Sequence, residues 1–242
     1  MYNQMNFNNL IDCFENSKGH NVELRIRQLE LMNHIFVTNY NYLKNFFLHV
    51  KKEENAIEII KTGNQDSFDT FSFELTRHFF NFIMATKAYI DQTRRWVNTY
   101  YDNTDFKKKY SDEVKNTFAN NILCKFIQDL RNYQTHYMIP FTAYSASFST
   151  KEPFSFKISL DKNKLMEYKK WTVDSISYIN SYEKDINVET FCTDYYVLVK
   201  DFYENFFSEI IKYHKKDLDD LKVIKNELSK RQPKLEPLYF DK

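Results

Sequence analysis

The chain has 242 residues, and its 34 Lys or Arg and 33 Asp or Glu side chains leave a formal net charge of +1 at pH 7. A near-neutral balance gives no long-range attraction to nucleic acid, so any RNA contact has to come from a local group of basic residues. With only two glycines and no His-Glu-x-x-His, Cys-x-x-Cys or Gly-x-Ser-x-Gly motif, the sequence disfavours P-loop and dinucleotide-binding enzymes, zinc hydrolases, dithiol redox proteins and serine hydrolases.

Apolar residues recur at helical spacing along the first half of the chain. The spacing predicts a helix over residues 22–61 and a second over residues 67–101, with Ser67 as its N-cap. The polar run at residues 102–112 is predicted to be a connecting loop, in which Ser111 caps the helix that follows.

The pattern changes after Pro140, where a proline is expected to end a helix. Aromatic and aliphatic residues alternate with Ser, Thr and Lys over residues 142–149 and 154–160, and this period of two predicts a short β-hairpin at about 142–160. A hairpin is the one expected departure from helical structure.

Two further helices are predicted after the hairpin. Asp161 is expected to cap the first, which would extend through Ile179, and the second is a long helix over about residues 188–230 with a near-heptad aromatic stripe. No Pro/Gly/Ser-rich linker or internal repeat divides the chain. We therefore expect an all-α domain over residues 1–242, built as a bundle of long helices with a small β-hairpin insertion.

The cysteines indicate the compartment. Cys13, Cys124 and Cys192 are odd in number and far apart in sequence, which favours free thiols in a reducing environment over a disulfide framework. The polar residues 1–9 lack the basic and apolar segments of a signal peptide, and no apolar run is long enough to span a bilayer. The expectation is a cytoplasmic protein with no membrane partner.

Three groups suited to catalysis lie together on the helix predicted before Pro140: Arg131, Asn132 and His136. At about 100° per residue, the helix has an apolar face with one polar member, Gln134. That core face comprises Ile122, Leu123, Phe126, Ile127, Leu130, Tyr133, Gln134 and Tyr137. The opposite face comprises Lys125, Gln128, Asp129, Arg131, Asn132, Thr135 and His136. Arg131 and His136 are about 140° apart around the helix axis.

The segment Phe126-Ile-Gln-Asp-Leu-Arg-Asn-Tyr-Gln-Thr-His-Tyr137 resembles the Arg-x4-6-His signature of HEPN-domain proteins, a superfamily named for its occurrence in higher eukaryotes and prokaryotes as nucleotide-binding domains. A polar residue commonly follows the Arg in that signature, as Asn132 follows Arg131 here. The resemblance is confined to this segment and to the helical character of the chain.

The resemblance implies a HEPN-like helical bundle, two copies of which face each other across a dimer cleft, and metal-independent cleavage of RNA. It assigns phosphate binding to Arg131, proton transfer to His136 and orientation to Asn132. Tyr137 could stack on a base, although its angle places it nearer the core. The further candidates for substrate binding are Lys125, Gln128 and Tyr137.

The function expected from the resemblance is that of an endoribonuclease acting as a toxin or an anti-phage defence effector. Its expected partners are RNA, a second copy of the chain in a homodimer, and an antitoxin or nucleotidyltransferase. No cofactor and no metal are expected.

Other interpretations of the same residues stay open. Arg27 and His34 also fit the relaxed Arg-to-His spacing and fall on nearly the same helix face. Arg131 and His136 could be an ordinary solvated face, since a cation is favourable near a helix C-terminus. The alternative function is a non-catalytic interaction or regulatory protein on a HEPN-like scaffold, and a nucleotide-binding helical module without chemistry is a third.

Overall fold

The computed structural model describes residues 2–61, 64–140, 142–148 and 153–231. They divide into two compact units, one from residues 1–30 and 205–242 and the other from residues 31–204. Helices α2 (Lys18–Val50) and α9 (Val188–Tyr213) each contribute residues to both units. No described helix is both long and apolar enough to cross a membrane.

The smaller unit joins the two ends of the chain. It contains the short helix η1 (Tyr2–Gln4), α1 (Phe7–Glu15), α10 (Lys215–Arg231) and the adjoining ends of α2 and α9. Arg231 donates through Nη2 to the carbonyl oxygen of Tyr2 at 3.0 Å, and Lys225 pairs with Glu23. These contacts tie the start of the chain to α10.

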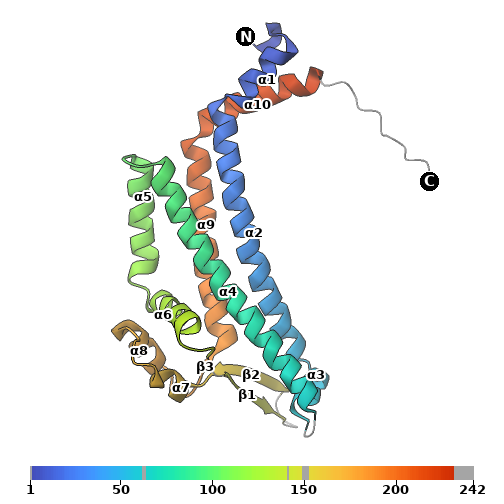
Figure 1. The fold of residues 1–242 in the computed structure, drawn as a ribbon, viewed down its shortest axis with the longest axis vertical. Helices are drawn as coiled ribbons and strands as arrows, with labels where there is room; N and C mark the ends of the chain where they lie inside the picture. The colour runs from blue at the N-terminus through green and yellow to red at the C-terminus, as the bar shows by residue number, and fades with distance from the viewer. Residues whose placement is uncertain (1, 62–63, 141, 149–152, 232–242) are drawn as a thin grey trace, which may run out of the picture. The chain divides into compact units, whose positions relative to one another are not determined.

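The larger unit is built on three long helices that lie side by side: the Leu31–Val50 part of α2, α4 (Gln65–Tyr100) and the first part of α9 (Figure 1). Its core is aromatic because these helices meet through stacked rings. Tyr89 of α4 stacks on Tyr203 of α9 with ring centroids 3.9 Å apart, and Tyr40 of α2 stacks on Tyr196 of α9 at 3.6 Å. Many of the Phe and Tyr residues of the sequence thus form the core.

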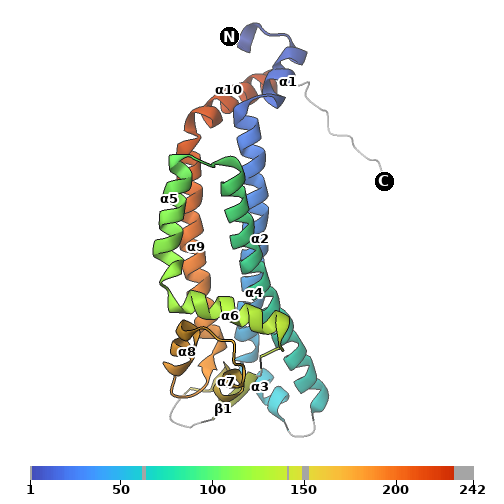
Figure 2. The ribbon, with the colours of Figure 1, turned by 60° about the vertical axis from the view of Figure 1, so that its left-hand side comes forward.

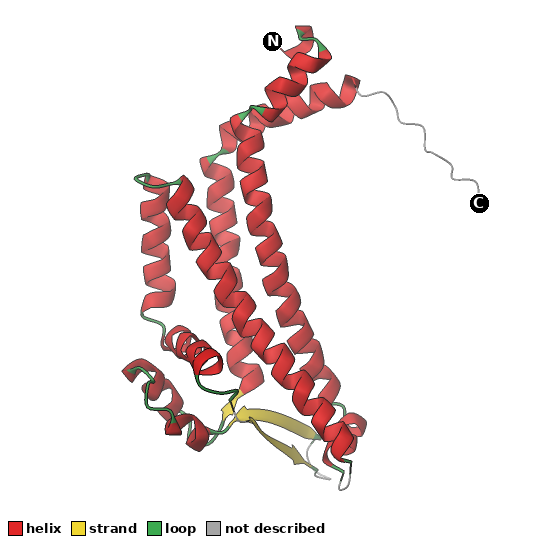
Figure 3. Cartoon of the chain, in the orientation of Figure 1, coloured by secondary structure: helices red, strands yellow, loops and turns green. Residues whose placement is uncertain are grey.

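The remaining elements of the larger unit are shorter. Helix α6 (Ile122–His136) lies across the long helices (Figure 2). Strands β1 (Thr142–Ser147) and β2 (Ser155–Leu160) form an antiparallel hairpin, and β3 (Ile186–Asn187) pairs antiparallel with β2. This small sheet lies near α3 (Glu53–Ile60) and the start of α4 (Figure 3). There the rings of Phe68 in α4 and Tyr144 in β1 pack together, with centroids 5.3 Å apart. The elements are α3 (Glu53–Ile60), α5 (Asp105–Val114), the π-helical turn η2 (Lys115–Ala119), α6 (Ile122–His136), β1 (Thr142–Ser147), β2 (Ser155–Leu160), α7 (Lys162–Glu167), α8 (Val173–Asn180) and β3 (Ile186–Asn187).

The structure confirms a mainly helical chain with a small β-hairpin where one is predicted, at residues 142–160. The turn of that hairpin, residues 149–152, lies outside the described residues. Asp161 caps the following helix as expected, since its side chain accepts from the Lys164 amide. That helix ends at Glu167, however, and a separate helix, α8, begins at Val173 with Thr172 as its cap.

The predicted loop at residues 102–112 is wrong. Most of it forms α5, which Thr104 caps by accepting from the Lys107 amide at 3.2 Å. Lysine is a good helix former, and the polar run hides two buried aromatic residues one helical turn apart, Phe106 and Tyr110. Ser111 therefore lies inside α5 and caps nothing.

Three predicted helix boundaries are also wrong. The helix predicted over residues 22–61 is interrupted between α2 and α3, and Asn64 rather than Ser67 caps α4. The helix predicted over residues 188–230 breaks at His214 into α9 and α10. A heptad stripe continued from Ile210 requires apolar residues near positions 214 and 217, where the chain has His214 and an aspartate that contact each other at 3.3 Å.

Gly19 allows α2 and α10 to approach closely. A Cβ atom at this position would lie 2.7 Å from the Cβ of Leu221 and would overlap the carbonyl oxygen of Asp217. Alanine is a better helix former than glycine by about 1 kcal/mol, but the clash involves backbone that cannot move without shifting α10.

We therefore expect Gly19→Ala to lower the free energy of unfolding by about 1–2 kcal/mol, because the clash outweighs the gain in helix propensity. Urea denaturation followed by circular dichroism measures the change. Asn21→Ala, at an exposed position of the same helix, is the control and should be neutral. A Gly19→Ala chain as stable as the unmodified protein would contradict this packing.

Candidate functional site

Helix α6 carries the motif residues and is held by its aromatic face. Asn121 caps its first turn by accepting from the Cys124 amide at 3.2 Å. Phe126 stacks on Tyr178 with ring centroids 4.6 Å apart, and Tyr133 stacks on Trp171 at 5.4 Å. The buried residues of α6 are Phe126, Ile127, Leu130, Tyr133 and Gln134.

The predicted core face of α6 is thus confirmed at its centre and wrong at its ends. Ile122 and Tyr137 are exposed, with Tyr137 at 49% of its maximum. Both lie at the ends of the helix, Ile122 as its first residue and Tyr137 as its C-cap. Gln134, the predicted polar member of the core face, is buried as expected.

Asp129 joins α6 to the start of α8. Its Oδ2 atom accepts three hydrogen bonds, from the Thr172 amide at 2.9 Å, the Thr172 hydroxyl at 2.7 Å and the Ser175 hydroxyl at 2.7 Å. A carboxylate at a helix N-terminus satisfies free amide donors and interacts favourably with the helix dipole. Nearby, Lys125 pairs with Asp174 at 2.6 Å.

We expect Asp129→Ala to lower the free energy of unfolding by about 2–3 kcal/mol, because it removes a charged acceptor shared by three donors, one of them on the fully buried Ser175. Urea unfolding followed by tryptophan fluorescence suits this test, since Trp171 directly precedes Thr172. The control is Asp174→Ala, which breaks a half-exposed ion pair between the same two helices and should cost less than about 1 kcal/mol. Equal losses for the two variants would refute the role of Asp129.

The three motif side chains differ in burial. Arg131 and Asn132 are half-buried and His136 is exposed at the last position of α6. Within the described part of the chain, no hydrogen bond or ion pair joins any of these three side chains to another residue. The hydroxyl of Thr135 donates to the backbone carbonyls of Arg131 and Asn132 instead. Arg131 Nε is buried and has no hydrogen-bond partner among the residues that the structure describes.

Arg131 and His136 do not converge within one chain. They are five positions apart on a regular helix, which separates them by about 7.5 Å along the axis and about 140° around it. Arg131 lines a cavity between α6 and α4, and His136 is not among the residues that line it. The structure therefore places the two groups on different sides of α6.

The three residues predicted to bind substrate do not lie at one site. Lys125 and Gln128 line the same cavity as Arg131, although the Lys125 ammonium is already paired with Asp174. Tyr137 does not line it. Its ring packs on the rings of Tyr133 and Tyr168, at centroid distances of 5.1 Å and 5.0 Å.

The cavity beside Arg131 has a volume of about 280 Å³ and includes charged residues of α4 that the sequence analysis missed. Asp91 accepts from Lys87 at 2.6 Å and from Arg94 at 2.9 Å, and all three line the cavity. Their spacing of four and three residues places them on one helical face, and that periodic charge pattern is the signal that could have found them. We call this space the Arg131 cavity.

Two protonatable groups of α6 are held neutral by burial. Burial raises the pKa of the Cys124 thiol to about 12, and burial raises the pKa of Tyr133 to about 12 as well. A thiol with that pKa supplies almost no thiolate at neutral pH and is a poor nucleophile. The imidazole of His136, by contrast, is exposed at the last position of α6.

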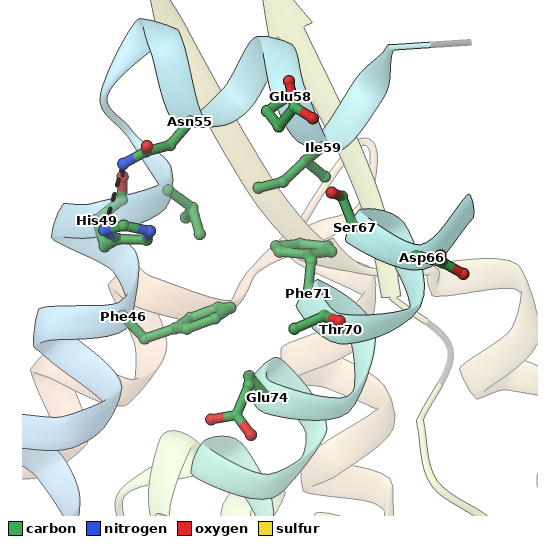
Figure 4. Close-up of a pocket in the computed structure, with 11 residues that line it drawn as sticks. Phe46, His49, Asn55, Glu58, Ile59, Asp66, Ser67, Thr70, Phe71 and Glu74 are labelled. Atoms are coloured by element: carbon green, nitrogen blue, oxygen red, sulfur yellow. Dashed lines mark hydrogen bonds between the residues drawn. The ribbon is translucent and has the colours of Figure 1, made fainter. Parts of the chain in front are cut away.

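A second cavity, of about 440 Å³, lies between α2, α3 and α4. The rings of Phe46 and Phe71 border it and stack with centroids 5.7 Å apart (Figure 4). Two of the carboxylates that line it have partners: Glu58 accepts from Asn64, and Glu74 pairs with Arg77. Among the described residues, no three His, Cys, Asp or Glu side chains are placed to share a metal ion.

Comparison of the chain with protein-family models, with curated proteins and with solved structures found no match.

Proposed function

We propose that this chain is a metal-independent endoribonuclease of the HEPN type, with Arg131, Asn132 and His136 as its catalytic residues. The observation that supports the proposal is that none of these three side chains bonds to another described residue, although Arg131 is half-buried. Side chains retained for structure normally have partners when they are buried. Polar side chains that bond to no other described residue are available to an external ligand.

The proposed reaction is a transesterification within RNA. The 2′-hydroxyl attacks the adjacent phosphorus, the bond to the 5′-oxygen breaks, and the products are a 2′,3′-cyclic phosphate and a free 5′-hydroxyl. The proton lost by the 2′-oxygen is balanced by the one the 5′-oxygen gains, and His136 is the group we assign to this transfer. Arg131 would stabilise the charge that develops on the non-bridging oxygens, and Asn132 would hold the phosphate or the imidazole in position.

We expect His136→Ala and Arg131→Ala to reduce RNA cleavage at least about 100-fold, since each removes either proton transfer or charge stabilisation. Cleavage of total RNA in EDTA, with analysis of the 3′ ends for cyclic phosphate, measures the effect. Growth inhibition on expression should be lost in parallel.

Arg27→Ala and His34→Ala provide the matched control. These two residues have a similar spacing on α2 and are exposed, so neither change should reduce cleavage. A well-folded His136→Ala protein with normal activity would refute the assignment.

The separation of Arg131 from His136 favours a site shared between two copies of the chain. We propose a homodimer in which the exposed side of α6 lines a cleft at the two-fold axis, so that His136 of one copy acts beside Arg131 of the other. A cleft also strengthens charge interactions by excluding water. Two Arg131 side chains would supply the local positive charge that the near-neutral chain lacks as a whole.

The dimer should be visible by size-exclusion chromatography with light scattering at the concentration used for cleavage. Mixing inactive Arg131→Ala and His136→Ala proteins should restore part of the activity, because a mixed dimer retains one intact pair. A fully active monomer, or no restoration in a mixture shown to exchange subunits, would contradict a shared site.

The second candidate is a non-catalytic interaction or regulatory protein. The observation that favours it is that Arg131 lines a cavity to which His136 does not contribute. Under the ribonuclease proposal, the biological role is that of a toxin or an anti-phage effector in the cytoplasm, with an antitoxin or a nucleotidyltransferase as partner. Relief of growth inhibition by a co-expressed neighbouring gene product would distinguish these roles.

A further inference from the structure

We propose that the Arg131 cavity binds a small phosphorylated ligand with an apolar body. The inference does not rest on the ribonuclease proposal, although Arg131 belongs to both. The cavity lies between α4, η2, α6 and α9, and side chains from each of these elements line it.

The charges of the cavity favour an anion. Four of its lining residues are cationic, and Asp91 is the single carboxylate among the described residues that line it. Asp91 neutralises one charge of the Lys87 and Arg94 pair, and Asp174, which does not line the cavity, neutralises Lys125. Two positive charges therefore remain, one of them on Arg131. The chain as a whole carries only +1, so the excess is local.

The Arg131 guanidinium can bind an anion through directional hydrogen bonds as well as through its charge. Its Nε is buried and has no hydrogen-bond partner among the described residues. Leaving a buried donor unsatisfied is unfavourable, more so for a charged group, and an anion in the cavity would remove that cost. A guanidinium also presents donors in a fixed fork that matches two phosphate oxygens.

The rest of the lining is apolar and decides which class of anion fits. Ile83, Ile90 and Phe118 line the cavity, together with Ile127 of α6 and Tyr195 of α9. A partly open space of about 280 Å³ with apolar walls and a few convergent polar groups resembles a small-molecule site, whereas an RNA strand requires a continuous basic groove. A phosphomonoester with one ring or a short alkyl group has both the required charge and the required apolar surface.

The test is isothermal titration of the full chain with phenyl phosphate, compared with inorganic phosphate, phenol and a single-stranded RNA oligomer. We expect phenyl phosphate to bind, more tightly than inorganic phosphate or phenol, and to bind more weakly as salt rises. Arg131→Gln should weaken binding about 10- to 100-fold, since it removes a charge-assisted hydrogen bond. Ala119→Leu, which adds bulk at the cavity wall, should weaken it without any change in charge.

Arg77→Gln is the matched control, because Arg77 lies on α4 but outside the Arg131 cavity. This variant should bind phenyl phosphate as tightly as the unmodified chain does. Circular dichroism establishes that each variant is folded. Equal binding of phenol and phenyl phosphate, RNA binding without phenyl phosphate binding, or full binding by folded Arg131→Gln would each overturn the proposal. His136→Ala should lose RNA cleavage and retain phenyl phosphate binding, which separates this site from the ribonuclease proposal.

Discussion

The arrangement of the candidate site depends on the hydrogen bonds that Asp129 accepts from the first turn of α8. One carboxylate oxygen receives a backbone amide and two hydroxyl groups, so it fixes both the position of α8 and the rotation of α6 about its own axis. The aromatic contacts of Phe126 and Tyr133 also hold α6 in this orientation, since they bury the adjoining side of the helix. Rotation matters because it decides which polar side chains of α6 face α4 and which face solvent.

With α6 held in this orientation, its polar residues have different roles. Asp129 and Lys125 bond to α8, while Arg131 faces the cavity bordered by α4. Among the three motif residues, only His136, at the end of the helix, is exposed. A helical wheel groups all these residues as one polar face, but packing on both sides of the helix divides that face into a structural edge, a cavity edge and an open surface.

The sequence was sufficient for features that depend on local periodicity. The helical character, the hairpin after Pro140 and the buried centre of α6 follow from apolar spacing and are present in the structure. The failures have tertiary causes. The polar run at residues 102–112 forms a helix because Phe106 and Tyr110 are buried by other elements, which no local signal reports. Likewise, the cavity combines α4 with α6, elements separated by α5 in the chain, so its charges could not be assigned to a site from spacing alone.

The guanidinium of Arg131 belongs to both the proposed ribonuclease site and the proposed anion site, so its position limits how the two sites can work together. In one chain Arg131 is directed at the cavity, with Nε buried, while His136 lies about 7.5 Å further along the helix axis and on another side. A phosphate deep in the Arg131 cavity is therefore out of reach of the imidazole on the same helix. The proposed RNA cleavage would require either that the guanidinium meets a phosphate at the surface of α6 or that a second copy supplies the imidazole. A small anion held in the cavity would interact with the same guanidinium, so the proposed binding of that anion and the proposed binding of RNA at α6 would be coupled through one side chain.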